Sequence, residues 1–404
     1  MRLSDQSFLA NLNNATNSLL HYCRTNQWAG YDPYDALNST LFRRTPLFQS
    51  KICRIAFTQA LKSSPFNVRL LVGVPKEQNP KALALFSTAL LKIPHEAEEA
   101  KDLLELLMSA KSAERPYPCW GYNFDWQNRT TFVPRAEPNI ICTTFAGNAL
   151  LDAYEKFHEH RHLAMASSAS EFLFQELGIA KFGDEICFSY TPRDQERVHN
   201  ANLLGAAFLA RLYRHTGIEK LFTHAVSAAR FSVNRQSADG SWPYGESPSQ
   251  QWIDNFHTGY NLIALRQIAN ITGISDFNDS VRKGFDFYRK HFFEQNGTAK
   301  YYHDQTYPID VHSIAQSIIT LVELRDLRPD NLRLTQKVCQ WAFDNMRHKS
   351  GCYYFRKHRF HTNRAPYMRW AQAWMFLALV TLKDYLESKE NLQANLSSSV
   401  GMPP

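Results

Sequence analysis

The chain has 404 residues, of which 44% are hydrophobic and 21% charged, values close to those of globular proteins that bury a large core. Basic residues (45) outnumber acidic ones (38) and give a net charge of +7, but no run of five or six basic residues occurs, which excludes a typical nucleic-acid-binding surface. The N-terminal segment lacks the apolar centre of a secretory signal and no apolar run is long enough to span a bilayer, so we expect a cytoplasmic protein without membrane insertion.

The seven cysteines are widely spaced and form no CxxC pair, and the chain contains no HExxH motif. An odd number of dispersed cysteines is typical of a reduced, intracellular protein. A zinc site would need clustered Cys or His ligands. We therefore expect neither a metal nor another cofactor.

Five short aromatic segments recur along the chain, and each precedes an apolar segment with helical periodicity. They carry Tyr122, Tyr190, Tyr244, Tyr302 and Tyr354, and the helices after them are expected to begin near Asn139, His199, Phe256, Asp310 and Met368. These starts lie roughly 54 to 60 residues apart, a period that fits one helical hairpin with an enlarged loop. If the hairpins close into a ring, the enlarged loops meet on one face and can form a single site.

Apolar periodicity divides the predicted helices into two sets. Helices with one charged face are expected on the outside of the ring, at about 7–24, 96–111, 161–176, 217–235, 277–294 and 330–347. Helices that are apolar nearly all round are expected inside it, at about 47–62, 139–157, 199–215, 256–272, 310–326 and 368–386. The sequence therefore predicts an all-α fold, an (α/α)6 toroid of six helical hairpins with enlarged aromatic loops on one face.

The toroid is predicted to form a single domain over residues 1–388. A helical insertion at about 64–93, which includes an additional helix at about 80–92, is expected between the first two hairpins. The C-terminal segment 389–404 is predicted to be a disordered tail.

The aromatic segment that carries Tyr122 also contains a candidate acid, Asp125, which lies between Phe124 and Trp126. Desolvation by these rings would raise the pKa of the carboxyl, as a general acid requires. The alternative is a structural salt bridge to Arg129 or Arg135. Both interpretations are open at this stage.

His199, Asn200 and Asn202 occupy the expected start of the next inner helix. Residues three apart share a helix face, so two of these three side chains could point to the centre of the ring. Their alternative role is helix capping.

The segment 242–260 holds the densest mixture of aromatic and titratable side chains in the chain. Tyr244 and Trp252 could cover the apolar faces of a sugar ring, while Glu246, Asp254 and His257 could contact its hydroxyl groups. The structural alternative makes the aromatic residues loop anchors and makes Asp254 the N-cap of the following helix.

The last two loops supply basic and aromatic candidates. Asp310 is best placed as a helix N-cap, with His312 a candidate for a site role. Tyr354, Arg356 and Arg369 form an aromatic and basic group whose guanidinium forks could clamp a carboxylate or phosphate. The structural alternative is that the arginines neutralise nearby acidic residues.

Several segments resemble known families. QSADGSW at 236–242 resembles the QW repeat of terpenoid cyclases, but the DDxxD and DxDD motifs of those enzymes are absent, so terpenoid cyclisation is the last of the alternatives. The segments GYDPYDALNS, CWGYNFDWQNR, VHNANLLGA, WPYGESPSQQWIDNFHTGYNL, YPIDVHSIAQ and YMRWAQAWM resemble the bacterial Vps-type exopolysaccharide and capsule biosynthesis proteins. That resemblance implies an (α/α)6 toroid related to six-hairpin glycosidases and uronate-processing enzymes. It also implies the polysaccharide biosynthesis machinery as a partner.

Three classes of function remain. A glycoside hydrolase would use two carboxyl groups among Asp125, Glu246 and Asp254. A uronate lyase or C5 epimerase would use Tyr or His to remove a proton next to a carboxylate that an arginine neutralises. A non-catalytic protein would bind the polysaccharide or serve as a scaffold.

We rank a carbohydrate-active enzyme first, acting on an oligo- or polysaccharide, and the basic balance favours an anionic one. Catalytic roles are predicted for Asp125, Glu246, Asp254 and His257. Substrate contacts are predicted for Tyr31, Tyr122, Trp126, His199, Asn200, Asn202, Tyr244, Trp252, His312, Tyr354, Arg356 and Arg369.

Overall fold

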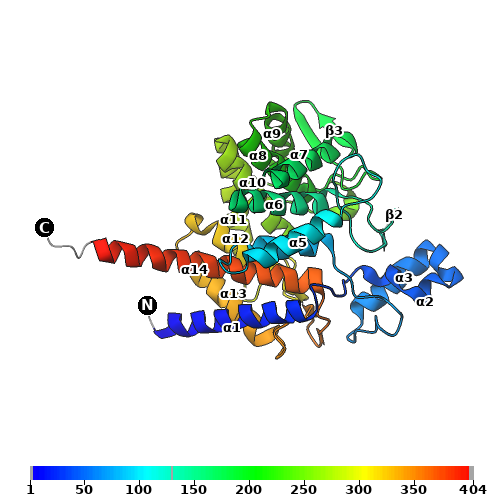
Figure 1. Ribbon diagram of the computed structural model, residues 1–404, viewed down its shortest axis with the longest axis horizontal. Coiled ribbons are helices and arrows are strands. Elements are labelled where there is room, and N and C mark those ends of the chain that lie inside the picture. Colours follow the sequence, from blue (N-terminus) through cyan, green and yellow to red (C-terminus); the bar gives the residue numbers. More distant parts are fainter. Residues whose placement is uncertain (1–2, 129–130, 400–404) are drawn as a thin grey trace.

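The computed structural model describes residues 3–128 and 131–399 and is mostly helical (Figure 1). The inner helices are α4 (Pro80–Leu90), α6 (Ile140–Phe157), α8 (His199–Thr216), α10 (Asn255–Thr272), α12 (Val311–Glu323) and α14 (Trp374–Ser399). The outer helices are α1 (Leu3–Thr25), α5 (Ala97–Ser109), α7 (His160–Gln175), α9 (Glu219–Val233), α11 (Ser275–His291) and α13 (Asn331–Asn345). Each inner helix packs against the next, and α14 packs against α4 and closes the ring. The predicted (α/α)6 fold is confirmed.

The first inner helix differs from the prediction. The expected inner helix at 47–62 corresponds to α3 (Lys51–Ser63), which buries only Thr58 and Leu61 and packs on the short turns η1 (Asp35–Asn38) and η2 (Pro46–Gln49). Together with α2 (Thr40–Arg43) it projects from the ring on the right of Figure 1. The ring position belongs to α4, in which every residue except Thr88 is buried.

The predicted insertion at 64–93 is therefore wrong in its position, because the inserted segment lies before α4 and the helix near 80–92 is part of the ring. The physical reason is in the two sequences: α3 is apolar on one face, whereas α4 is apolar nearly all round. The predicted disordered tail is also wrong in part. Helix α14 continues as far as Ser399, and residues 400–404 lie outside the described residues.

The enlarged loops join the ring at the N-terminal ends of the inner helices. The first turn of a helix has backbone N–H groups without partners inside the helix, and here the following loop supplies a carbonyl. The pairs are Ile140 to Tyr190 (3.0 Å), His199 to Tyr244 (3.1 Å), Asn255 to Tyr301 (2.9 Å), Val311 to Phe355 (3.1 Å) and Met368 to Tyr31 (3.0 Å). Loops from distant parts of the sequence are thereby gathered at one end of the ring.

The loops contain short hairpins. They are β1 (Trp126–Gln127) with β2 (Phe132–Val133), β3 (Ile179–Phe182) with β4 (Glu185–Phe188), and a three-stranded sheet of β5 (Ile309–Asp310), β6 (Arg356–Lys357) and β7 (Thr362–Asn363). In this last sheet Asp310 lies opposite Arg356. The three hairpins, β1–β2, β3–β4 and β6–β7, lie in the loops that precede α6, α8 and α14, and β5 directly precedes α12.

The QW-like segment has a structural role. The Gln236 side-chain amide donates to the carbonyl oxygens of Gly240 (2.9 Å) and Ser280 (3.0 Å), and the Trp242 indole donates to Ser232 (2.8 Å). Gly240 has a φ of 93° and lies against the backbone of Lys283, where a side chain would collide. The segment therefore fastens the end of α9 to α11.

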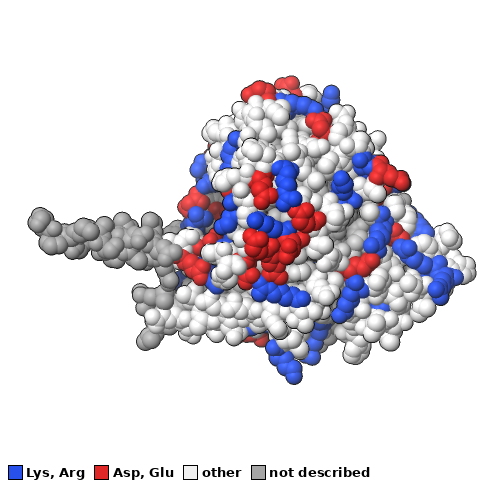
Figure 2. All heavy atoms as spheres, viewed as in Figure 1, with Lys and Arg blue, Asp and Glu red and all other residues white. Residues whose placement is uncertain are grey.

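Among the described helices, none combines the length and apolar character needed to cross a bilayer. Figure 2 shows acidic and basic side chains next to each other on the face viewed there.

Candidate functional site

The start of α10 holds a histidine–carboxylate pair. Asp254 caps the helix by accepting from the His257 backbone N–H (3.0 Å), and its other oxygen lies 2.7 Å from His257 Nδ1 and 3.0 Å from Trp252 Nε1. Asp254 is 2% exposed, whereas the side chain of His257 is 20% exposed. The carboxylate makes Nδ1 the protonated nitrogen, so the lone pair is on Nε2. Asp254 is therefore the N-cap that the structural alternative expected, and it also orients His257.

Aromatic rings surround this histidine. Tyr244 and Trp252 are stacked with centroids 4.6 Å apart, and Tyr244 also lies 4.6 Å from the His257 ring. Phe256 packs on the histidine at 4.1 Å. Trp252 is 39% exposed, so part of its surface is free to meet a ligand. Flat aromatic surfaces next to a titratable group suit the apolar face of a sugar ring.

A second, buried histidine lies on α12. His312 is 1% exposed, its Nε2 shares a hydrogen bond with the Tyr260 hydroxyl, and Trp370 and Trp374 each lie 4.7 Å from its ring. Burial, aided by nearby cations, holds the pKa of His312 well below its usual value, so the imidazole is neutral. Its Nδ1 is buried and has no hydrogen-bond partner within the described part of the chain.

Arg369 and Arg356 are already paired with carboxylates. Arg369, in the π-helical turn η5 (Met368–Ala373), donates from Nε and one terminal nitrogen to the two oxygens of Asp32, at 2.6 and 2.8 Å. Arg356 donates to Asp310 at 2.9 and 2.6 Å, and Asp310 also accepts from the Trp370 indole at 2.9 Å. The structural alternative, neutralisation of acidic residues, describes both arginines.

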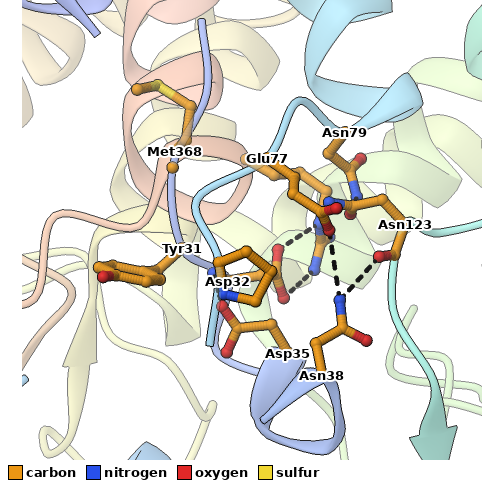
Figure 3. A pocket seen from close by; sticks show the side chains of 11 residues that line it. Tyr31, Asp32, Asp35, Asn38, Glu77, Asn79, Asn123 and Met368 are labelled. Atoms are coloured by element: carbon orange, nitrogen blue, oxygen red, sulfur yellow. Dashed lines mark hydrogen bonds and ion pairs between the residues drawn. The ribbon is translucent and has the colours of Figure 1, made fainter. Parts of the chain in front are cut away.

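The ion pair of Asp32 and Arg369 lies in a small polar pocket of about 10 Å³ (Figure 3). That volume is about enough for one water molecule. Figure 3 shows Tyr31 and Met368 on one side of the pair and Asn38, Glu77 and Asn123 on the other. The insertion before α4 therefore contributes to the wall of this small pocket.

Tyr122 and Trp126 come from the neighbouring loop. The Tyr122 hydroxyl lies 3.3 Å from the Tyr190 hydroxyl, and the Arg369 guanidinium lies 4.9 Å from the Tyr122 ring centre. Trp126 meets the Tyr190 ring edge-on at 6.2 Å. Tyr354, in contrast, packs against Arg364 at 5.5 Å and His348 at 6.0 Å.

Asp125 is held on both carboxylate oxygens. One oxygen accepts from the Arg135 backbone N–H at 2.7 Å, and the other forms an ion pair with Arg43. The salt-bridge alternative is therefore the one the geometry supports, with a partner that the sequence did not suggest, whereas Arg129 lies outside the described residues.

Glu246 is similarly engaged. Its oxygens lie 3.3 Å from His199 Nε2 and 3.4 Å from Arg235 Nε. The contact with His199, together with Arg235, holds the pKa of Glu246 below its usual value. The carboxylate therefore stays ionised at neutral pH, which makes it a poor proton donor.

Glu196 is a carboxyl group that the sequence did not single out. It lies in the loop before α8 and accepts from the Gln250 side-chain amide at 3.0 Å. Burial, reinforced by Asp194, raises the pKa of Glu196. No motif signals this residue, because its environment arises from two loops that meet in space.

The polar residues at the start of α8 divide into two kinds. Asn202 accepts from the Phe188 N–H at 3.1 Å and donates to Ala228 at 2.7 Å, and the His199 Nδ1 lies 3.3 Å from Ser232. Asn202 and His199 thereby join α8 to β4 and α9. The side-chain oxygen of Asn200 is buried without a partner among the described residues, which makes Asn200 the better candidate for a ligand contact.

No protein-family model and no curated protein matches this sequence. Among solved structures, cellobiose 2-epimerase from Bacillus thermoamylovorans is similar over 75% of this chain and 87% of its own, with 11% identity and a TM-score of 0.58. A sugar epimerase from a ruminal bacterium covers 76% of this chain and 90% of its own, with 12% identity and a TM-score of 0.60. A GH76 α-mannanase from Bacteroides thetaiotaomicron covers 77% and 87%, with 11% identity and a TM-score of 0.57. At this identity the likeness establishes the six-hairpin, glycosidase-like fold.

Proposed function

We propose that this protein is a carbohydrate-active enzyme that moves a proton at a sugar carbon next to a carbonyl group, as an epimerase or isomerase does, with His257 as the general base. The observation that carries the proposal is the 2.7 Å contact between Asp254 and His257 Nδ1. It keeps the lone pair of a partly exposed imidazole on Nε2, next to the stacked rings of Tyr244 and Trp252.

In the proposed reaction the sugar rests on the aromatic surface, and His257 Nε2 takes the proton from the carbon next to the carbonyl. The C–H electron pair moves into the new carbon–carbon double bond, and the carbonyl π electrons move to the oxygen, which becomes the anionic oxygen of an enediolate; return of the proton to the carbon restores the carbonyl group. The imidazolium formed is stabilised by Asp254. Tyr260, whose hydroxyl is hydrogen-bonded to the neutral His312, is the second group able to return a proton.

The structural likeness to a cellobiose 2-epimerase and to a sugar epimerase supports this class of reaction. A uronate C5 epimerase or lyase uses the same first step with a carboxylate in place of the aldehyde, so it belongs to the same proposal. The resemblance of several segments to Vps-type proteins supports a bacterial exopolysaccharide as the glycan and its biosynthetic machinery as the partner. Hydrolysis is less favoured, because arginines hold both Asp125 and Glu246.

A non-catalytic glycan-binding protein is the second candidate. The observation that favours it is the exposure of Trp252, which is stacked on Tyr244 as a ready-made platform. The two candidates differ in whether His257 is needed for a reaction or only for binding.

The test incubates the protein with reducing and uronate-containing oligosaccharides in deuterium oxide and follows deuterium incorporation by NMR. We expect wild-type protein to label the carbon next to the carbonyl and His257→Asn to lose about 10²- to 10⁴-fold in rate. His215→Asn is the matched control, because His215 forms a similar pair with Glu155 (2.8 Å) in the last turn of α8, away from the loop end of the ring. Binding without labelling or any other change in the sugar would favour the second candidate.

A further inference from the structure

Lys81 is a lysine inside the ring. It is the second residue of α4, it is 3% exposed, and its ammonium group lies 4.3 Å from the ring centre of Phe145, 5.2 Å from Trp374 and 5.5 Å from Tyr260. These rings belong to α6, α14 and α10, so the amine lies among three other inner helices. Its position near the start of α4 puts it toward the end of the ring where the loops gather.

This amine has no polar partner within the described residues: no carboxylate pairs with Nζ and no oxygen or nitrogen accepts a hydrogen bond from it. Ring faces attract an ammonium group but accept none of its three N–H bonds in the ordinary way. The side chain is almost entirely buried, and a cation held in such surroundings without a counter-ion costs free energy in the absence of a ligand. A residue kept under such conditions is a candidate for ligand binding.

The local charges leave Lys81 without a counter-ion. The charged groups that act on Lys81 are Arg369, a second cation, and Asp32, whose two oxygens both accept from Arg369. His312, on α12, is held neutral. Burial and Arg369 lower the pKa of Lys81 to about 7, which agrees with a cation that lacks an anion.

Helix α12 carries three further buried polar atoms that have no hydrogen-bond partner within the described residues. His312 shares Tyr260 and Trp374 as ring contacts with Lys81, and its Nδ1 has no partner among the described residues. Ser313 Oγ and Gln316 Oε1 are also buried without partners in that part of the chain. Of these atoms, His312 Nδ1 belongs to the residue that shares ring contacts with Lys81, and a saccharide hydroxyl group could satisfy it.

We propose that the substrate is an anionic saccharide whose acidic group pairs with Lys81. This inference rests on the proposed function and assigns its substrate class. A single oxyanion would accept hydrogen bonds from the ammonium group and balance its charge. A uronate carboxylate and a sugar phosphate share this chemistry. Arg356 and Arg369, the cations that the sequence favoured for this role, already have carboxylate partners.

The test measures binding by titration calorimetry for a uronate oligosaccharide, its carboxyl-reduced neutral counterpart and the corresponding sugar phosphate. We expect wild-type protein to bind at least one acidic ligand about 10-fold or more tightly than the neutral one. Whichever of the uronate and the sugar phosphate binds more tightly identifies the acidic group. Lys81→Met should remove this preference by lowering the affinity for the acidic ligand to about that for its neutral counterpart, whereas Lys81→Arg should retain part of the preference.

Lys357→Met is the control, because Lys357 also lies over a ring, Trp341 at 5.6 Å, but on β6 and bonded to Asn345. It should keep the preference. The proposal is overturned if wild-type protein binds acidic and neutral glycans equally, or if only free inorganic phosphate or acetate binds. If Lys81→Met does not fold, the comparison of acidic and neutral ligands on wild-type protein still decides whether the ligand is anionic, and Lys81→Arg tests the residue.

The two proposals fail in different ways. Equal binding of acidic and neutral glycans with deuterium incorporation retained would refute the role of Lys81 and leave the proposed reaction standing. A Lys81-dependent preference without any reaction would refute the enzyme and leave the assignment of an anionic ligand.

Discussion

Arg369 and Asp32 are 337 residues apart in the chain and form a two-point ion pair, with donor–acceptor distances of 2.6 and 2.8 Å. Arg369 is the second residue of η5, which leads into α14, and Asp32 belongs to the insertion that follows α1. Both side chains are almost completely buried. The pair joins the two ends of the sequence at the mouth of the ring.

Removal of Asp32 should destabilise the protein strongly. Asp32→Ala leaves Arg369 buried without a counter-ion, and we expect the free energy of unfolding in urea to fall by about 3 to 5 kcal/mol. The double variant Asp32→Leu with Arg369→Met removes both charges and should recover most of this loss. A fall below about 1 kcal/mol for Asp32→Ala would mean that Arg369 is hydrated in solution.

Asp254→Asn should separate capping from orientation of the histidine. The Asn side chain can still cap α10, but its amide would face the Trp252 indole N–H in place of an acceptor, so we expect a loss of about 1 to 3 kcal/mol in stability. Its neutral amide cannot hold His257 in the same tautomer or stabilise an imidazolium, so deuterium exchange should fall by about 10²-fold or more. Exchange at the wild-type rate in a folded variant would contradict the role given to His257.

Lys81→Met should stabilise the protein at neutral and acidic pH while impairing ligand binding. The pKa of Lys81 is lowered from 10.5 to about 7 in the folded protein, so between these values the unfolded chain binds the additional proton. Stability conferred through this group therefore rises with pH across that window and is lowest below it. Replacement of an unpaired buried charge by an apolar side chain should add about 1 to 4 kcal/mol at pH 6.

The measurement for Lys81 is urea unfolding at several pH values, taken as the difference between variant and wild type, which cancels the other titrating groups. The advantage of Lys81→Met should shrink by at most about 1.4 kcal/mol per pH unit as the pH rises above 7. Destabilisation by Lys81→Met at every pH would indicate a structural role for the lysine.

Gly240→Ala should weaken the QW-like segment. A Cβ at this position would collide with the backbone of Lys283, and the φ of 93° is unfavourable for alanine. We expect a loss of stability of more than about 2 kcal/mol, measured by thermal unfolding. Gly217→Ala is the control: it also has positive φ, 66°, but open space around the added atom, and should cost only about 1 kcal/mol.

The fold was largely readable from local patterns. The starts of α6, α8, α10 and α12 follow aromatic loops and begin long apolar helices, and such signals depend only on residues near one another in the sequence. The first inner helix was missed because α3 also has helical periodicity. The ring takes α4 rather than α3 because the neighbouring inner helices must cover their apolar surfaces on both sides, and only α4 is apolar nearly all round.

In the site, the contact of Asp254 with His257 could be foreseen, because residues three apart at a helix start necessarily lie close together. Lys81 could not, because a single lysine in an apolar helix is ordinarily a solvated residue, and its burial depends on rings from α6, α10 and α14. The sequence thus established the repeat and most of the helices, and it singled out Asp254 and His257 without pairing them. The charge balance of the ring interior arose from folding, because ring closure decides which cations meet a carboxylate and which do not.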